Sequence, residues 1–135
     1  MAVSVGSKAE RRLEITAEMV KAYAAITGDF NPLHFDAEFT AKTRFGRLIA
    51  HGGLTTGILH ALIAMDLPGP DSVFMSQSWS FPRPVFIGDA IIAEGTVKSA
   101  REGRGIYVME FVVRNQAGEA VLTGEAAVYR AAAVD

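Results

Sequence analysis

The feature that most limits how this chain can fold is the segment of residues 54–67, LTTGILHALIAMDL. Its apolar positions fall on nearly every side of a helix, and the Pro-Gly-Pro of residues 68–70 ends it. A helix that is apolar all round must be buried on all sides. The rest of the chain is therefore expected to surround this helix.

Four segments after this helix have the composition of β-strands. They cover residues 72–81, 90–100, 105–114 and 119–130. The intervening REGR and NQAG stretches have turn composition, which predicts hairpins and an antiparallel sheet. The sequence thus predicts an α+β fold in which an antiparallel sheet wraps a long central apolar helix.

The first half of the chain has helical patterning. Thr16 is placed to cap an amphipathic helix that ends at Gly28, and Asp36 is placed to cap a short helical turn that reaches Ala41. No internal repeat or linker composition divides the sequence. Residues 1–135 are therefore expected to form a single domain.

Composition excludes several functional classes. The 13 Lys and Arg against 15 Asp and Glu give a net charge of −2, so nucleic acid is not an expected partner. With no cysteine, disulfides, thiolate zinc sites and a cysteine nucleophile are excluded. The N-terminus has no long apolar core, and His60 interrupts the longest apolar stretch. We therefore expect no membrane segment and a cytoplasmic protein.

The stretch TGDFNPLH, residues 27–34, sets an acid and an imidazole five positions apart. Pro32 biases Asn31 away from helix, so the chain is expected to reverse between Asp29 and His34. A carboxylate and an imidazole that share one water molecule form an acid–base pair for adding or removing water. The structural alternative is a turn in which Asp29 binds loop amides and His34 packs in the core.

The stretch AHGG, residues 50–53, stands where the loop meets the apolar helix. Gly52 and Gly53 allow a substrate to approach backbone N–H groups at the positive end of the helix dipole, where an oxyanion could be stabilised. The alternative is that the glycines only form a tight entry turn. His51 is interpreted as structural, with its ring capping the loop.

Together these stretches resemble a known family. YAAITGDFNPLHFDAEFT, AHGGL and SQSWSFPRPVFIGD are similar to the MaoC-like dehydratases, in particular the R-specific enoyl-CoA hydratases (hydratase 2). The resemblance covers nearly the whole chain from about Met19. It implies a hotdog fold and a homodimer whose sheets join edge to edge.

The resemblance also implies an activity, the reversible syn addition of water to a trans-2-enoyl-CoA, which gives an R-3-hydroxyacyl-CoA without a cofactor. Asp29 and His34 match the catalytic pair of the family. Asn31 matches a polar residue that lines the water site. Gly52 matches the backbone N–H that meets the thioester oxygen.

The resemblance departs at His60, nine positions after His51, where the simple bacterial hydratases carry a serine. His60 is expected at the floor of the substrate pocket, or else as a helix histidine bonded to a neighbouring carbonyl. A metal site built from Asp29 and all three histidines matches no metal motif in its spacing, so no metal is expected.

Cations near these stretches are candidates for binding the phosphates of coenzyme A. Lys42, Arg44 and Arg47 lie between the two motifs, and Arg83 stands in FPRPV. The alternative is a solvated loop face. An acyl carrier protein would need a broader basic surface, so coenzyme A is favoured as the carrier.

Other classes of function remain open from the sequence. A 3-hydroxyacyl-ACP dehydratase, a hotdog thioesterase and a non-catalytic acyl-thioester-binding subunit would share the fold. The thioesterase would not need the paired acid and imidazole, and the non-catalytic alternative is opposed by the intact pair. An apolar tunnel beside the central helix, formed partly by the second protomer, is expected.

Overall fold

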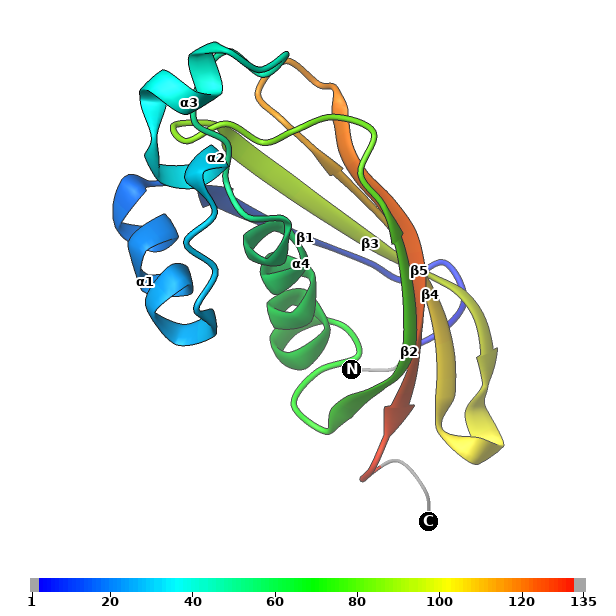
Figure 1. Ribbon diagram of the computed structural model, residues 1–135. Helices are drawn as coiled ribbons and strands as arrows, with labels where there is room; N and C mark the ends of the chain where they lie inside the picture. The colour runs from blue at the N-terminus through cyan, green and yellow to red at the C-terminus, as the bar shows by residue number, and fades with distance from the viewer. Residues whose placement is uncertain (1–2, 133–135) are drawn as a thin grey trace.

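The computed structural model describes residues 3–132 (Figure 1). The helices are α1 (Ala17–Thr27), α2 (Pro32–Phe35), α3 (Ala37–Ala41) and α4 (Gly52–Ala61), and a π-helical turn, η1 (Leu62–Asp66), extends α4. The strands are β1 (Lys8–Glu14), β2 (Ser72–Ser80), β3 (Ala90–Arg101), β4 (Ile106–Arg114) and β5 (Ala120–Arg130), with a 3₁₀ turn, η2 (Glu102–Arg104), between β3 and β4.

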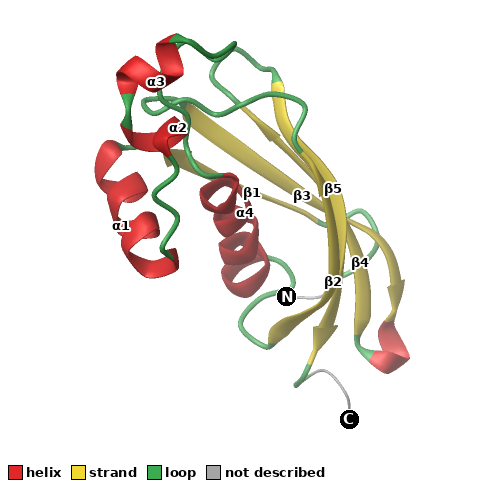
Figure 2. Ribbon diagram, viewed as in Figure 1, coloured by secondary structure: helices red, strands yellow, loops and turns green. Residues whose placement is uncertain are grey.

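The five strands form one antiparallel sheet in the order β1-β3-β4-β5-β2. The sheet curves, and α4 lies against its concave face (Figure 2). This confirms the predicted α+β arrangement of an antiparallel sheet around the central helix. The four strands predicted after the helix are present, and β2 and β1 are the edges.

Strand β1 was not predicted from the sequence. Its sequence, KAERRLE, carries only two apolar residues, Ala9 and Leu13, so the alternation that marks a half-buried strand is weak. Pairing with β3 forms the strand, and Arg11 on its inner side is neutralised by Asp66 of η1. Tertiary contacts therefore decide this element.

Helix α4 supplies the centre of the core, although it is not buried on all sides. Leu59, Leu62 and Ile63 of α4 and η1 are fully buried against the sheet. In contrast, His60 and Met65 are exposed. The expectation of burial all round was wrong for this side of the helix, which the sheet of one chain leaves uncovered.

The predicted helix caps are confirmed. The Thr16 hydroxyl accepts a hydrogen bond from the Met19 N–H at 3.2 Å, and Gly28 ends α1 in the left-handed conformation with φ of 81°. Asp36 accepts from the Phe39 N–H at 3.0 Å and begins α3. These caps fix where the chain leaves α1 and how it returns towards α4.

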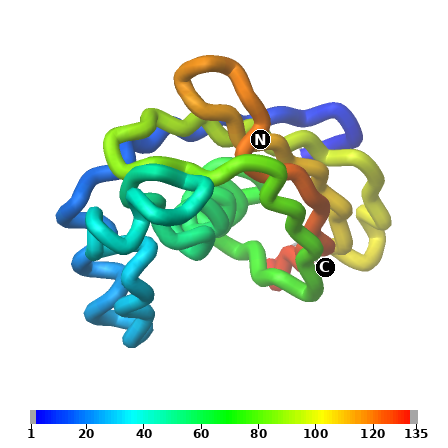
Figure 3. Tube along the Cα trace, turned by 45° about the horizontal axis from the view of Figure 1, so that its top comes forward, coloured from blue at the N-terminus to red at the C-terminus, as the bar shows by residue number. Residues whose placement is uncertain are grey.

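Helices α1, α2 and α3 lie on the same side of the sheet as α4, and α2 and α3 are near the N-terminal end of α4 (Figure 1). Figure 3 shows the three grouped together, away from the β3–β4 hairpin. The backbone of Leu33 accepts from the Ile49 N–H at 3.0 Å, which fastens α2 to the segment that enters α4. The two motifs of residues 27–34 and 50–53, which are separate in the sequence, are thereby brought to one place.

An ion pair lies on the outer face of the sheet. Lys98 on β3 donates a hydrogen bond of 2.7 Å to Glu125 on β5, and this bond and the negative charge raise the pKa of Lys98. Among residues 3–132, no helix has the length and apolar character needed to cross a bilayer.

A matched pair of substitutions tests the burial of the α4–η1 segment. Leu62→Ala removes side-chain carbons from a fully buried position and should lower the free energy of unfolding by about 2–5 kcal/mol. Ile26→Ala removes the same number of carbons from a side chain that is 84% exposed, and should change it by less than about 0.5 kcal/mol. Urea denaturation measures both, and equal losses would contradict this core.

Candidate active site

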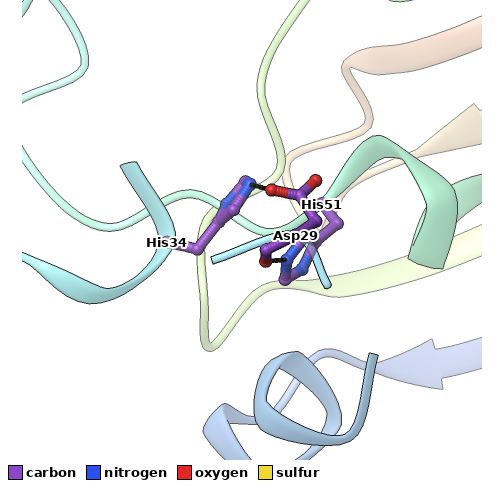
Figure 4. A group of neighbouring side chains, drawn as sticks. All are labelled: Asp29, His34 and His51. Carbon is purple, nitrogen blue, oxygen red and sulfur yellow. Dashed lines mark hydrogen bonds and ion pairs between the residues drawn. The ribbon is translucent and has the colours of Figure 1, made fainter. Parts of the chain in front are cut away.

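Asp29 and His34 face each other beside the N-terminal end of α4 (Figure 4). Asp29 follows the left-handed Gly28 that ends α1, and His34 lies on α2. His34 Nε2 is 3.9 Å from Asp29 Oδ1. The Asp29 side chain is 47% exposed, whereas that of His34 is 9% exposed, so the pair stands at the boundary between solvent and the interior.

The backbone fixes the orientation of the His34 ring. Its Nδ1 is 2.7 Å from the carbonyl oxygen of Ile49, and because a carbonyl only accepts, Nδ1 carries the proton. The other nitrogen, Nε2, is directed at Asp29, and in the tautomer with the proton on Nδ1 it carries a lone pair. The separation of 3.9 Å is too long for a direct hydrogen bond, and a water can bridge such a gap.

The Asp29 main chain and side chain are both held. Its Oδ1 accepts from the Asn31 N–H at 3.3 Å, and its own N–H donates to the Thr27 hydroxyl at 3.2 Å. Its carbonyl accepts from His51 Nε2 at 2.9 Å. The carboxylate keeps lone pairs for a further donor.

Asn31 has a local role in this turn. Its side-chain oxygen accepts from the Leu33 N–H at 3.0 Å, so Asn31 is the N-cap of α2, with Pro32 at the first helical position. The predicted reversal is therefore a cap followed by one helical turn. The predicted role of Asn31 in lining a water site stays a prediction.

His51 is buried, with an exposed fraction of 2%, at the N-cap position of α4. Its ring lies 3.8 Å from that of His34 and 4.6 Å from that of Tyr23, between centroids. The expectation that the ring caps the loop in which His51 sits was wrong, because the His51 side chain makes no capping bond at the start of α4 and bonds the Asp29 carbonyl in the turn after α1 instead. The ring contacts with His34 and Tyr23 could not be anticipated from spacing alone.

Gly52 and Gly53 begin α4 but face different surroundings. As the first residue of the helix, Gly52 has an N–H with no acceptor inside the helix. A Cβ on Gly52 would stand 3.2 Å from the Phe81 ring, at the edge of a cleft. A Cβ on Gly53 would lie 1.7 Å from the Tyr23 hydroxyl oxygen. Gly53 is therefore required for packing against α1, and Gly52 is the glycine on the cleft.

An open cleft of about 570 Å³ adjoins Gly52. Its lining includes Ile49, whose carbonyl holds His34, and does not include Asp29 or His34 themselves. The segment FPRPVF forms one wall. The lining residues are Arg44, Phe45, Ile49, Gly52, Thr55, Phe81, Pro82, Arg83, Pro84, Val85 and Phe86.

The predicted phosphate-binding cations are distributed unevenly. Arg44 and Arg83 line the cleft, and Lys42 does not. Arg83 is engaged, because its guanidinium lies 3.4 Å from Glu119 and donates to the Ala120 carbonyl at 3.2 Å. Arg47 lies over the Phe86 ring, 4.0 Å from its centroid.

His60 lies apart from the Asp29–His34 pair. Its Nε2 is 3.1 Å from Gln77 Oε1, which also accepts from the Trp79 indole N–H at 2.9 Å, and its ring is 4.2 Å from that of Phe74. His60 thus bridges α4 to the edge strand β2 through a side chain, and not through the backbone carbonyl of the structural alternative. It does not line the cleft beside Gly52, and its predicted place at the floor of a substrate pocket stays a prediction.

Three of the four residues that were considered as a metal site, and for which no metal is expected, lie close together. Asp29, His34 and His51 each offer a ligand atom, all within 4.8 Å of one another. The His34 and His51 rings each bond a backbone carbonyl through one nitrogen, and the two rings are stacked at 3.8 Å between centroids. The expectation that no metal binds here stays a prediction.

The sequence and the fold match known proteins. Residues 3–119 match the model of the MaoC like domain, and the chain belongs to this family. It is 41% identical to the (R)-specific enoyl-CoA hydratase of Aeromonas caviae, over 93% of this chain and 94% of the relative. It is 34% identical to the mitochondrial 3-hydroxyacyl-[acyl-carrier-protein] dehydratase of Arabidopsis thaliana, over 92% of this chain and 75% of the relative.

The solved structure of an (R)-hydratase from A. caviae involved in PHA biosynthesis superimposes with a TM-score of 0.91 at 41% identity, covering 95% of this chain and 97% of that one. The hotdog fold implied by the sequence resemblance is confirmed.

Two glycines of α4 test the packing of the site. Gly53→Ala forces Tyr23 away and should lower the Tm, because the added Cβ would overlap the Tyr23 hydroxyl. Gly57→Ala has open space around the Cβ and should stabilise the helix by up to about 1 kcal/mol. Thermal denaturation compares the two variants. A stabilised Gly53→Ala variant would show that Tyr23 is not packed on α4.

Proposed function

We infer that the protein is a hydratase that adds water reversibly to a trans-2-enoyl-CoA to give an R-3-hydroxyacyl-CoA. The observation that carries this inference is the Asp29–His34 pair, with facing atoms 3.9 Å apart beside the first residue of α4. Family membership and the similarity to an (R)-specific enoyl-CoA hydratase support it.

In the proposed reaction one water molecule bridges Asp29 and His34. The water donates one hydrogen to the Asp29 carboxylate and the other to His34 Nε2, which is free because Nδ1 carries the proton. The water oxygen attacks Cβ of the enoyl thioester while one of its O–H bonds breaks, and the Asp29–His34 pair takes the released proton. The pair then returns one proton to Cα, so the elements of one water molecule are added and both residues regain their starting protonation states. Because Asp29 and His34 both act from one side of the bound substrate, the hydroxyl and the hydrogen add to the same face of the double bond.

Gly52 is proposed to stabilise the charge that this attack creates. Attack at Cβ moves negative charge onto the thioester oxygen, which forms an enolate-like intermediate. The Gly52 N–H, at the positive end of the α4 dipole and on the cleft, is placed to donate to that oxygen. A donor of this kind can contribute about 3 kcal/mol of transition-state stabilisation.

Asp29→Asn tests the proposed reaction. The amide cannot take a proton from water, so kcat should fall by about 10²- to 10⁴-fold while the fold is retained. The measurement follows the absorbance of crotonyl-CoA, with the circular dichroism spectrum as control.

We propose that no cofactor takes part, so dialysis of the wild-type enzyme against EDTA should leave kcat unchanged.

The same assay separates the competing functions. Release of free CoA thiol without loss of the enoyl double bond would indicate a thioesterase. Equal inactivity of wild type and Asp29→Asn, with retained binding of the thioester, would indicate a non-catalytic binding subunit. An S-configured product would contradict the assignment to the R-specific family.

Coenzyme A is proposed as the acyl carrier. Arg44 lines the cleft, and among residues 3–132 the structure records no ion pair for its guanidinium, whereas Arg83 is engaged by Glu119. Arg44 is therefore the cation of the cleft best placed to receive a phosphate. The alternative carrier, acyl carrier protein, is suggested by the similarity to the Arabidopsis dehydratase.

Arg44→Gln tests the carrier. It should raise the KM for crotonyl-CoA by about tenfold, the loss expected for one charge-assisted contact, and leave the KM for crotonyl-pantetheine unchanged. Steady-state kinetics on both thioesters make the measurement. A kcat/KM higher for the enoyl-ACP than for the enoyl-CoA would favour the alternative function, a 3-hydroxyacyl-ACP dehydratase.

The cytoplasmic location expected from the sequence stays a prediction.

A homodimer joined through β2 is proposed. Strand β2 is a long edge strand, and Val73, Met75 and Phe81 on or beside it are exposed. Such an edge is a template for pairing with another strand, and a second copy provides one with two-fold symmetry. The second protomer would cover the open side of α4 near His60 and complete the proposed apolar tunnel.

Met75→Lys tests the dimer. A charge on the proposed interface should shift the protein towards monomer and lower kcat/KM, whereas Glu10→Lys on the other edge strand should do neither. Light scattering after gel filtration gives the mass. Full activity in a monomeric wild-type protein would contradict the proposed interface.

A further inference from the structure

We propose that His51 is a positioning residue for both members of the acid–base pair. Its Nε2–H holds the Asp29 carbonyl at 2.9 Å, and its ring packs on the His34 ring at 3.8 Å between centroids. The inference rests on the proposed hydratase function. It assigns to His51 a role in the reaction beyond the loop-capping role expected from sequence.

The bond to Asp29 anchors an otherwise exposed turn. Asp29 lies between Gly28, which has φ of 81°, and the cap of α2. Its other hydrogen bonds, to the Thr27 hydroxyl and the Asn31 N–H, join only neighbours in the same turn. The bond from His51 ties this turn to the N-terminus of α4. It therefore sets the position of the carboxylate relative to Gly52.

The ring contact fixes the direction of His34 Nε2. The bond from His34 Nδ1 to the Ile49 carbonyl holds one atom of the ring, and the ring could still rotate about it. Stacking on His51 restricts that rotation. His51 is in turn supported by Tyr23, whose ring is 4.6 Å away and whose hydroxyl occupies the space that Gly53 leaves free.

The hydrogen bonding of His51 selects its tautomer. Because Nε2 donates to a carbonyl, Nδ1 holds a lone pair, and in the described part of the chain this buried atom has no hydrogen-bond partner. A proton on Nδ1 would create a buried N–H without an acceptor. The surroundings therefore select the Nε2–H tautomer of His51, which is the one that donates to Asp29.

Two variants separate the two contacts. His51→Gln keeps an N–H near the Asp29 carbonyl and removes the ring, whereas His51→Phe keeps the ring and removes the donor. Each should lower kcat on crotonyl-CoA by about 10- to 100-fold, the loss expected when reacting groups are misplaced. Each should change KM by less than about threefold, because His51 does not line the cleft.

Val121→Ala, at a fully buried position of β5, is the control for lost stability. It should lower the Tm without lowering kcat. If either His51 variant keeps kcat within about twofold of wild type, the role of the contact that it removes is overturned. If Val121→Ala loses as much kcat as the His51 variants, their loss of activity would be explained by lower stability, and the positioning role of His51 would be overturned.

The wild-type protein provides a test that depends on neither variant folding nor activity. ¹⁵N NMR of the histidine rings should show the Nε2–H tautomer for His51 and the Nδ1–H tautomer for His34. An Nδ1–H tautomer of His51 would overturn the proposal, since its Nε2 could not donate to Asp29. If instead the tautomers are as expected and the wild-type enzyme does not hydrate enoyl-CoA, the proposed function fails and the geometry stands.

Discussion

Two hydrogen bonds from histidine rings to backbone carbonyls determine the arrangement of the site. His34 Nδ1 bonds the Ile49 carbonyl at 2.7 Å, and His51 Nε2 bonds the Asp29 carbonyl at 2.9 Å. Both bonds join the segment after α1 to the segment that enters α4. In the first the histidine belongs to the earlier segment, and in the second it belongs to the later one. Together they fix both tautomers and bring the acid, the base and the first N–H of α4 into one region.

The core makes this arrangement possible. Leu59, Leu62 and Ile63 hold α4 and η1 against the concave face of the sheet, so the N-terminus of α4 has a fixed position. Gly53 lets Tyr23 of α1 pack directly on that helix. The proposed catalytic groups are therefore positioned by a helix end that the core holds in place.

Much of this could be predicted from the sequence, because the informative features are local. The caps at Thr16 and Asp36, the left-handed Gly28 and the four later strands follow from residue type and spacing. Strand β1 could not be predicted, because pairing with β3 and the contact of Arg11 with Asp66 stabilise a mostly charged segment. Likewise, burial of α4 was overestimated, since apolar composition does not show which side a single chain leaves open.

The candidate site was only partly predictable for the same reason. The spacing of Asp29 and His34 indicated an acid–base pair. The contacts of His51 could not be predicted in this way, because its ring stacks on His34, 17 residues earlier in the sequence, and bonds Asp29, 22 residues earlier. Tyr23, the aromatic residue that begins the YAAITGDFNPLH stretch, was the one indication in the sequence that another ring lies beside His51. The separate surroundings of Gly52 and Gly53 could be distinguished only from the three-dimensional structure.

The central claim is that one water, held between Asp29 and His34, reacts from a single face of the substrate. Hydration of crotonyl-CoA in D₂O, with NMR analysis of the product, tests it most directly. The account predicts an R configuration at the hydroxyl carbon, with deuterium at Cα added to the same face as the hydroxyl. Addition of deuterium to the opposite face would contradict it.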